Sequence, residues 1–576
     1  MLDAPTLARP PTRRGGPAVA RRRSAVRERF GLALAAGVPL VFLGIFFAWP
    51  VLSIVGRGLV TDGLLDLSGF VDVFSRPRTW RIVGLTLGQA ALGTLGAVVL
   101  GVPGAYVLYR TRFRGQRLAR ALVTVPFVLP TVVVGVAFRS LLAPGGLLGF
   151  LELDGTLIAI VLALVFFNYG VVIRAVGSMW AHLDERPTEA ARALGAPPWR
   201  AFWSVTLPSL TPAIASAAAV VFLYCAAAFG IILIHGGRRF GTIETEIYLQ
   251  TTQYFDLRAA AVLSITQLVV IVLVLRVAAA ARSRRERALR MAADADRAVG
   301  GAHPWRRGDL PATVVTALVV AFLIVLPMAA LVVRSLRTPD GWGLGNYANL
   351  AGTGGGSVLS VPVWEALGNS LRVAVDATVL AVVIGASVSV VLSRRPRGLA
   401  GRRAISTLDA VFMLPLGVSA VTVGFGFLIT LNRPPLDLRS SLVLIPIAQA
   451  IVAIPLVIRT TFPVLRAIDE RQHEAAAILG ASPARVFRFV DLPVLGRSLG
   501  LAVGFAFAIS LGEFGATAFL ARPDRPTLPV VIFRLIGRPG AENIGMAMAA
   551  SVVLALVTAG VMALAERLRV ATASEL

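Results

Sequence analysis

Lysine is absent from this chain of 576 residues, so all 56 of its basic side chains are arginines. A nucleotide-binding P-loop needs a lysine after its glycine-rich turn, and no such run exists here. One cysteine, Cys225, excludes an internal disulfide, and four scattered histidines give no metal-ligand spacing. We therefore expect no cofactor, no metal site and no enzymatic activity in this chain.

Charged residues are also scarce, at 15% of the chain against 56% hydrophobic residues and a mean hydropathy of +0.78. Apolar runs longer than about 18 residues recur, and a water-soluble fold of this length could not bury them all. The composition predicts an all-α polytopic membrane protein with about 12 transmembrane helices. We expect spans near 32–57, 82–109, 121–142, 157–181, 209–235, 258–281, 312–335, 367–393, 404–430, 441–466, 495–521 and 542–565.

Acidic residues number only 31, which leaves a net charge of +25. The arginines crowd into 9–29, 110–120, 282–307 and 394–403. These clusters fall in alternate loops if the chain starts in the cytoplasm, which is the positive-inside pattern. We therefore expect both termini to be cytoplasmic, and the arginines to face anionic membrane lipids and not nucleic acid.

One polar segment occurs twice, as EAARALGAPPWRAFWSVTLP from Glu189 and as EAAAILGASPARVFRFVDLP from Glu474. The copies are identical at 12 of 20 positions, and the step from Glu189 to Glu474, called here the repeat offset, is about half the chain. The repeat offset also relates Phe229-Gly230 to Phe514-Gly515. An even number of spans in each half predicts two parallel six-helix repeats related by a pseudo-two-fold axis along the membrane normal.

The chain divides at its polar stretches. A basic, proline-rich start and an arginine-rich central stretch flank the first repeat. We expect a disordered cytoplasmic arm at 1–30, a first repeat at 31–281 with a cytoplasmic segment at 184–203, a linker at 282–311, a second repeat at 312–566 with its segment at 469–488, and a cytoplasmic tail at 567–576.

The duplicated segment predicts a helix, a glycine and a second short helix. Asp184 and Asp469 suit helix starts, while Gly195 and Gly480 suit the helix end, where a Cβ atom would be strained. Large and small apolar side chains would then be available to fill a groove in another protein, namely Ala191, Leu194, Trp199 and Phe202 in half one and Ala476, Leu479 and Phe487 in half two. The alternative is an ordinary loop that packs on its own helices.

These residues resemble the EAA signature of permeases from binding-protein-dependent ABC importers, in the fused form that carries two copies. The resemblance covers about 80–281 and 365–566. It implies two coupling helices for a cytoplasmic ABC ATPase dimer, an external substrate-binding protein, and a place in the bacterial inner membrane, with ATP hydrolysis in the separate ATPase. By resemblance the coupling residues are Glu189, Ala190, Ala191, Leu194 and Gly195, and Glu474, Ala475, Ala476, Leu479 and Gly480.

Polar groups at membrane depth are costly, so each is a candidate for the translocation pathway. The candidates are Asn168, Gln267, Asp376, Gln449 and Glu513. Interhelical hydrogen bonds, or pairing with an arginine such as Arg139 or Arg372, are the alternative roles. Pro130 and Pro415 each follow a leucine within a span and are expected to kink the helices that form the gate.

The transported solute is less well defined. Within the resemblance, fused double permeases serve mainly ferric iron and thiamine, and the run LGEFGAT around Glu513 is also similar to thiamine, molybdate and sulfate permeases. The oxyanion permeases are usually two separate chains, which favours ferric iron or thiamine. A secondary transporter with two parallel six-helix repeats is the competing class, and it would need ion-coupling carboxylates within the membrane.

Overall fold

The computed structural model describes residues 34–237, 239–290, 302–396, 398–434 and 436–573. The expected arm at 1–30 lies outside these residues, as do the last three residues of the tail. Helices form most of the described structure, and its only strands are four pairs of strands with two residues in each strand. Nine described helical stretches are long and apolar enough to cross a membrane, or up to 12 if each bent pair is one span.

The first half begins with the helical stretch Leu34–Leu59, which ends in α2. Five helices follow α2 in the bundle, and α13 is the last helix of this half. These are α2 (Trp49–Leu59), α4 (Pro77–Arg110), α5 (Gln116–Val128), α6 (Thr131–Leu142), α7 (Leu157–Ala181), α10 (Leu207–Ala226) and α13 (Leu257–Arg290). The described part of the linker thus starts as an extension of α13, and residues 291–301 lie outside the description.

The second half repeats this order. Its first span joins α14 (Leu310–Leu318) to α15 (Leu326–Ser335) through the π-helical turn Val319–Val325. The remaining elements are α17 (Val363–Ser393), α18 (Leu399–Met413), α19 (Ala420–Thr430), α20 (Leu444–Arg466), α23 (Leu492–Gly512) and α26 (Ala541–Ala573). The expectation of an all-α polytopic membrane protein is confirmed.

The third span of each half is broken at its proline. α5 and α6 meet at an angle of 106° around Pro130, and α18 with its 3-10 turn meets α19 at 94° just after Pro415. Proline has no backbone N–H to continue a helix, and its ring clashes with the preceding turn. The expected kinks are therefore present, and they are full breaks.

The fifth span of each half lies earlier in the chain than expected, since the helical stretches run from 198 to 226 and from 487 to 512. α10 ends at Ala226 and α23 at Gly512, whereas we expected helix to 235 and 521. Four short helices follow, α11 (Gly230–His235) and α12 (Ile243–Thr252) in half one and α24 (Thr517–Leu520) and α25 (Leu528–Ile536) in half two. Thr242 and Thr245 form a capping box that starts α12, within a stretch expected to be a loop.

Within each half, the second, fourth and fifth spans pack together: α4 on α7 and α10, and α17 on α20 and α23. Glycines allow close approach, since a Cβ atom on Gly101 would lie 2.8 Å from Val172 and one on Gly385 would lie 2.7 Å from Val457. Val172 and Val457 are themselves related by the repeat offset. The two halves therefore share one packing arrangement.

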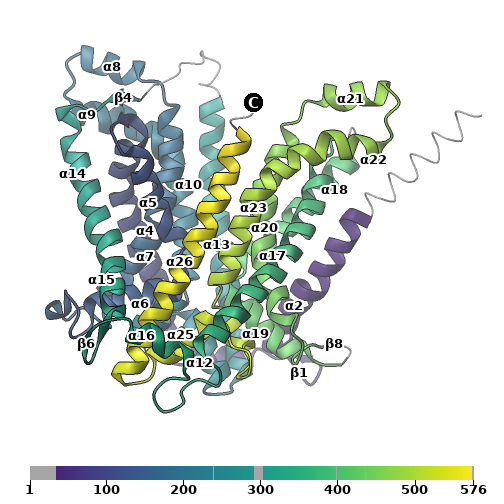
Figure 1. Ribbon diagram of the computed structural model, residues 1–576. Coiled ribbons are helices and arrows are strands. Elements are labelled where there is room, and N and C mark those ends of the chain that lie inside the picture. Colours follow the sequence, from purple (N-terminus) through teal and green to yellow (C-terminus); the bar gives the residue numbers. More distant parts are fainter. Residues whose placement is uncertain (1–33, 238, 291–301, 397, 435, 574–576) are drawn as a thin grey trace, which may run out of the picture.

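The first span of each half crosses to the other half. α2 packs on α13 and α19, while α14 packs on α4 and α15 packs on α6. Figure 1 shows α14 and α15 at the left edge beside α4 and α6, and α2 at the right edge beside α18 and α19. The first span of each half therefore packs against helices of the other half.

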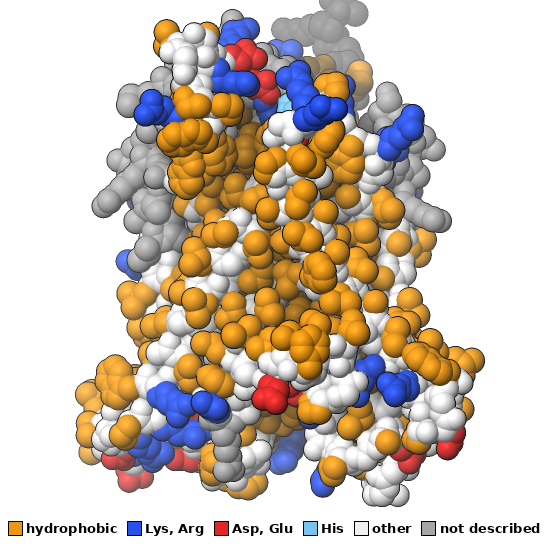
Figure 2. All heavy atoms as spheres, turned by 90° about the vertical axis from the view of Figure 1, so that its left-hand side faces the viewer, with side chains coloured by type: hydrophobic (Ala, Val, Ile, Leu, Met, Phe, Trp, Pro, Cys, Tyr) orange, Lys and Arg blue, Asp and Glu red, His pale blue; other side chains and the backbone are white. Residues whose placement is uncertain are grey.

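The surface fits a membrane protein. Figure 2 shows a broad band of hydrophobic side chains across the middle of the molecule, with charged side chains gathered at its two ends. Exposed members of the apolar surface include Leu95 on α4 and Phe322 in the first span of half two. An apolar belt of this kind is stable only in contact with lipid.

Candidate coupling and translocation sites

The first duplicated segment begins after α7. Asp184 Oδ1 accepts a hydrogen bond from the Arg186 N–H at 3.0 Å, where α8 (Arg186–Ala193) starts. Gly195 then takes the left-handed conformation, with φ at +90°. The Gly195 N–H donates to the Arg192 carbonyl and the Ala196 N–H donates to the Ala191 carbonyl, each at 3.0 Å, which is the Schellman helix end.

The second segment repeats these features. Asp469 Oδ1 accepts from the Arg471 N–H at 3.0 Å near the start of α21 (Glu470–Ile478). Gly480 has φ at +80°, and the Ala481 N–H donates to the Ala476 carbonyl at 3.0 Å. The predicted helix starts and glycine helix ends are therefore present in both halves. Figure 1 shows α8 and α21 at the same end of the molecule.

Both segments expose apolar side chains. Leu194 is 90% exposed and Leu479 is 87% exposed, each just before the glycine. The two leucines are related by the repeat offset. The remaining candidates are the exposed Glu189, Ala190, Gly195, Glu474, Ala475 and Gly480 and the half-buried Ala191 and Ala476.

Two expected groove-filling residues take a different position. Phe202 stacks on Trp180 with ring centroids 6.2 Å apart, so it packs against the protein's own α7. Phe487 is half-buried, whereas Phe489 is 68% exposed. The π-helical turns Phe202–Thr206 and Phe487–Asp491 rotate these aromatic residues relative to the α-helical spacing that we expected.

At the opposite end, the two halves meet through aromatic rings. Phe229 and Phe514 stack with centroids 5.3 Å apart. Phe229 also packs on Tyr248, and Phe514 packs on Phe533, at 5.5 and 5.4 Å. These two contacts are equivalent, because the repeat offset relates Phe229 to Phe514 and Tyr248 to Phe533. The pseudo-two-fold axis therefore passes between Phe229 and Phe514, and the repeat offset was the sequence signal that pointed to both.

Two predicted polar residues are buried in half one. Gln267 Nε2 donates to Glu244 Oε1 at 3.1 Å and to the Ala226 carbonyl at 3.3 Å. Asn168 Nδ2 donates to the Leu164 carbonyl at 2.9 Å and contacts Cys225 Sγ at 3.4 Å. Sequence reasoning missed Glu244, because it lies in the short helix α12 outside every long apolar run.

Two others are brought together in half two. Glu513 accepts hydrogen bonds from the N–H groups of Ala516 and Thr517 at 2.7 and 3.0 Å, and from Thr517 Oγ1 at 2.6 Å. Gln449 Nε2 donates to the same Thr517 hydroxyl at 3.3 Å. Glu513 therefore caps α24 and is linked to Gln449 through Thr517. Arg139 bonds elsewhere, to the Ile536 carbonyl at 3.4 Å.

Asp376 lies apart from the other candidates. It is exposed on α17 and lines a pocket of about 100 Å³ with Arg372, Arg439, Arg522 and Arg525. The pairing of Asp376 with Arg372 is not seen among the ion pairs of the described residues. Asp376 therefore belongs to a basic surface pocket.

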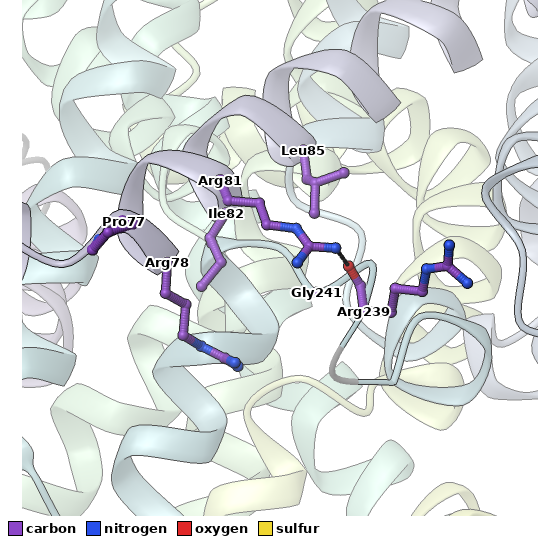
Figure 3. A pocket seen from close by; sticks show the side chains of 7 residues that line it. All are labelled: Pro77, Arg78, Arg81, Ile82, Leu85, Arg239 and Gly241. Carbon is purple, nitrogen blue, oxygen red and sulfur yellow. Dashed lines mark hydrogen bonds between the residues drawn. The ribbon is translucent and has the colours of Figure 1, made fainter.

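A second basic pocket lies where α4 begins. It has a volume of about 310 Å³ and is lined by Pro77, Arg78, Arg81, Ile82, Leu85, Arg239 and Gly241 (Figure 3). Two of its guanidinium groups are engaged, since Arg78 pairs with Glu246 at 2.8 Å and Arg81 donates to the Arg239 carbonyl at 3.0 Å. The pocket combines an apolar wall with a positive rim.

Asp154 lies in the loop before α7. Burial favours its neutral form, but the hydrogen bond with His235 at 3.2 Å and the positive charge of Arg139 outweigh burial, and the pKa of Asp154 lies below its usual range. His235 Nε2 also lies 3.0 Å from the Gly135 carbonyl. Asp154 and His235 thereby join this loop to α6 and α11.

Two repeats of one helical fold, each with a copy of the duplicated segment, define a fused membrane permease. Residues 93–287 match the family described as "Binding-protein-dependent transport system inner membrane component". The probable sulfate transport system permease protein cysT of Chlorokybus atmophyticus is 30% identical over 34% of this chain and 69% of that protein. The chain belongs to this family, and it is the permease of an ABC importer.

Longer matches come from fused relatives. The thiamine transport system permease protein ThiP of Escherichia coli (strain K12) is 28% identical over 81% of this chain and 85% of that protein. ThiP of Brucella abortus (strain 2308) is 26% identical over 90% of this chain and 92% of that protein. These relatives are permease components and not enzymes, and the family assignment decides against a secondary transporter.

Proposed function

We propose that this chain carries thiamine across the bacterial inner membrane. The observation that carries the proposal is the match to permeases named for thiamine over as much as 90% of the chain, which includes both repeats. Thiamine is a cation with aromatic rings, and aromatic faces attract organic cations. The aromatic contact between Phe229 and Phe514 suits such a solute better than it suits a hydrated oxyanion.

The energy source in this proposal is a separate ATPase dimer in the cytoplasm. Leu194 and Leu479 are the exposed apolar residues that directly follow α8 and α21, and Glu189 and Glu474 lie on these helices. Two equivalent segments at one end of the molecule suit a two-fold partner. This end is then cytoplasmic, together with both termini.

The solute enters from an external substrate-binding protein at the opposite end. We assign the pathway to the contact between the halves, where Gln267 bonds to Glu244 in half one and Thr517 links Gln449 to Glu513 in half two. The amide oxygens of Gln267, Gln449 and Asn168 have no hydrogen-bond partner among the described residues. A passing solute could bond to them once the rings separate.

The test is reconstitution of the chain with its ATPase and binding protein in proteoliposomes. We expect ATP-dependent uptake of labelled thiamine and stimulation of ATP hydrolysis by the thiamine-loaded binding protein. Sulfate, molybdate and ferric iron serve as matched competitors at equal concentration. Uptake of any of these in place of thiamine would contradict the assignment of the solute, while ATP-independent uptake would contradict the coupling to an ATPase.

A further inference from the structure

An arginine holds the start of the first coupling segment. Arg110 is the last residue of α4, and its side chain is only 6% exposed. Its guanidinium forms an ion pair with Glu185, the residue before α8, and donates to the Trp180 carbonyl near the end of α7 at 3.3 Å. One side chain therefore joins the ends of α4 and α7 to the start of α8.

The second half has a similar arrangement, with its arginine and the carbonyl acceptor each one residue further along the chain. Arg395 follows the end of α17, and it donates to the Arg466 carbonyl at the end of α20 at 2.8 Å. It pairs with Glu470, the first residue of α21, at 3.8 Å. The repeat offset relates Glu185 to Glu470, while Arg395 lies one residue beyond the position that matches Arg110 when Gly101 and Gly385 are aligned. The repetition makes a chance surface contact an inadequate explanation.

We propose that Arg110 and Arg395 are positioning residues that fix the two coupling segments to the transmembrane bundle. The inference rests on the proposed function of these segments in ATPase coupling. The planar guanidinium fork of arginine reaches a carbonyl and a carboxylate at once, which a lysine ammonium does less well. When the bundle helices move, the segment is carried with them, and movement is thereby exchanged with the ATPase.

The contacts of Arg110 with Glu185 and of Arg395 with Glu470, called here the first and the second tether, differ in strength. The linker covers the first one: Tyr106 Oη donates to Asp309 Oδ1 at 2.6 Å, and the Tyr106 ring lies 5.3 Å from that of Trp180. The position equivalent to Tyr106, counted from the aligned Gly101 and Gly385, is Val390, whose side chain cannot donate. The second pair is open to solvent, with side chains 52% and 56% exposed. Exposed ion pairs contribute little, whereas partly buried charged hydrogen bonds contribute more.

Glu185→Ala and Glu470→Ala form a matched pair of variants, because both side chains are partly exposed and neither fills the core. Each full-length variant is reconstituted with the ATPase and the binding protein. In Glu185→Ala we expect amide exchange in α8 to be about tenfold faster and stimulation by the loaded binding protein to be lost, with basal ATP hydrolysis retained. In Glu470→Ala we expect the rate of amide exchange in α21 to change by less than about twofold. Glu185→Asp retains the charge and should restore part of the stimulation.

The two measurements separate the inference from the function on which it rests. Unchanged exchange in α8 of Glu185→Ala would overturn the tether. Faster exchange with full stimulation would leave the tether in place and overturn the coupling role of the segment. A larger effect in Glu470→Ala than in Glu185→Ala would overturn the inferred difference in strength.

Discussion

The role that the sequence predicts for Glu513 differs from the role that its hydrogen bonds in the structure indicate. As a carboxyl group in an apolar run it was a candidate for contact with the solute. In the structure both of its oxygens are occupied by donors from Ala516 and Thr517, so its direct task is to start α24. Glu244 differs, because its Oε2 atom has no hydrogen-bond partner among the described residues.

Glu513→Gln should therefore lower stability as well as transport. Three donor groups point at the carboxylate, and the amide of glutamine presents an NH₂ group to at least one of them, so at least one hydrogen bond is lost at a cost of about 1–3 kcal/mol. We expect a lower melting temperature in detergent together with reduced thiamine uptake. Asp376→Asn is the control, since that side chain is exposed and should leave the melting temperature unchanged. Reduced uptake of Glu513→Gln at an unchanged melting temperature would instead indicate a contact with the solute.

Burial of Asn168, Gln267, Gln449 and Glu513 could be predicted from the sequence, because long apolar runs leave an isolated polar residue no water to face. Glu244 could not be found in this way. It lies in α12, whose 10 residues are too few to span a membrane, so hydropathy alone placed the stretch outside. Its burial depends on contacts with helices distant in sequence.

The two duplicated segments are the elements that the sequence predicted best. Their signals are local: an aspartate that accepts an N–H at the helix start and a glycine that takes φ near +90° at the end. The breaks after Ala226 and Gly512 were missed because the side chains remain apolar across them. Hydropathy depends on the side chains alone, so it cannot predict where the backbone leaves the helix within an apolar run.

Replacing Gly195 and Gly480 with valine should disturb both segments. No atom lies within 4 Å of a Cβ atom at either position, so the effect is confined to the backbone. A β-branched residue in the left-handed conformation costs about 1–2 kcal/mol. We expect the double variant to insert normally but to lose stimulation of ATP hydrolysis by the loaded binding protein.

The matched control is Gly368→Val on α17. Gly368 also has open space around it, but its φ is in the ordinary helical range. The control should couple as the parent does, so that bulk and conformation are distinguished. Undiminished stimulation in the double glycine variant would refute the assignment of the segments to ATPase coupling.

At the scale of the whole molecule, the repeat predicted two similar halves but not how they join. α2 packs on α19 of the second half, and α14 packs on α4 of the first, so each half is completed by the other. Internal similarity reports the contacts that both halves share. Contacts between the halves depend on surfaces that the repeat leaves undefined, and these include the stacked rings of Phe229 and Phe514.

The orientation of the whole molecule can be tested with the chain's one cysteine as the built-in control. Cys225 is buried, so the parent should not react with a membrane-impermeant maleimide. Phe150→Cys and Leu194→Cys place thiols at side chains that are 77% and 90% exposed.

Arginine-rich loops remain in the cytoplasm, and the same count of spans puts residue 150 outside and residue 194 inside. We therefore expect Phe150→Cys to be labelled in intact spheroplasts, and Leu194→Cys to be labelled only after the membrane is permeabilised. Labelling of both from one side would contradict the orientation, and with it the cytoplasmic docking of an ATPase on α8, because a segment that faces outward cannot meet an ATP-hydrolysing partner.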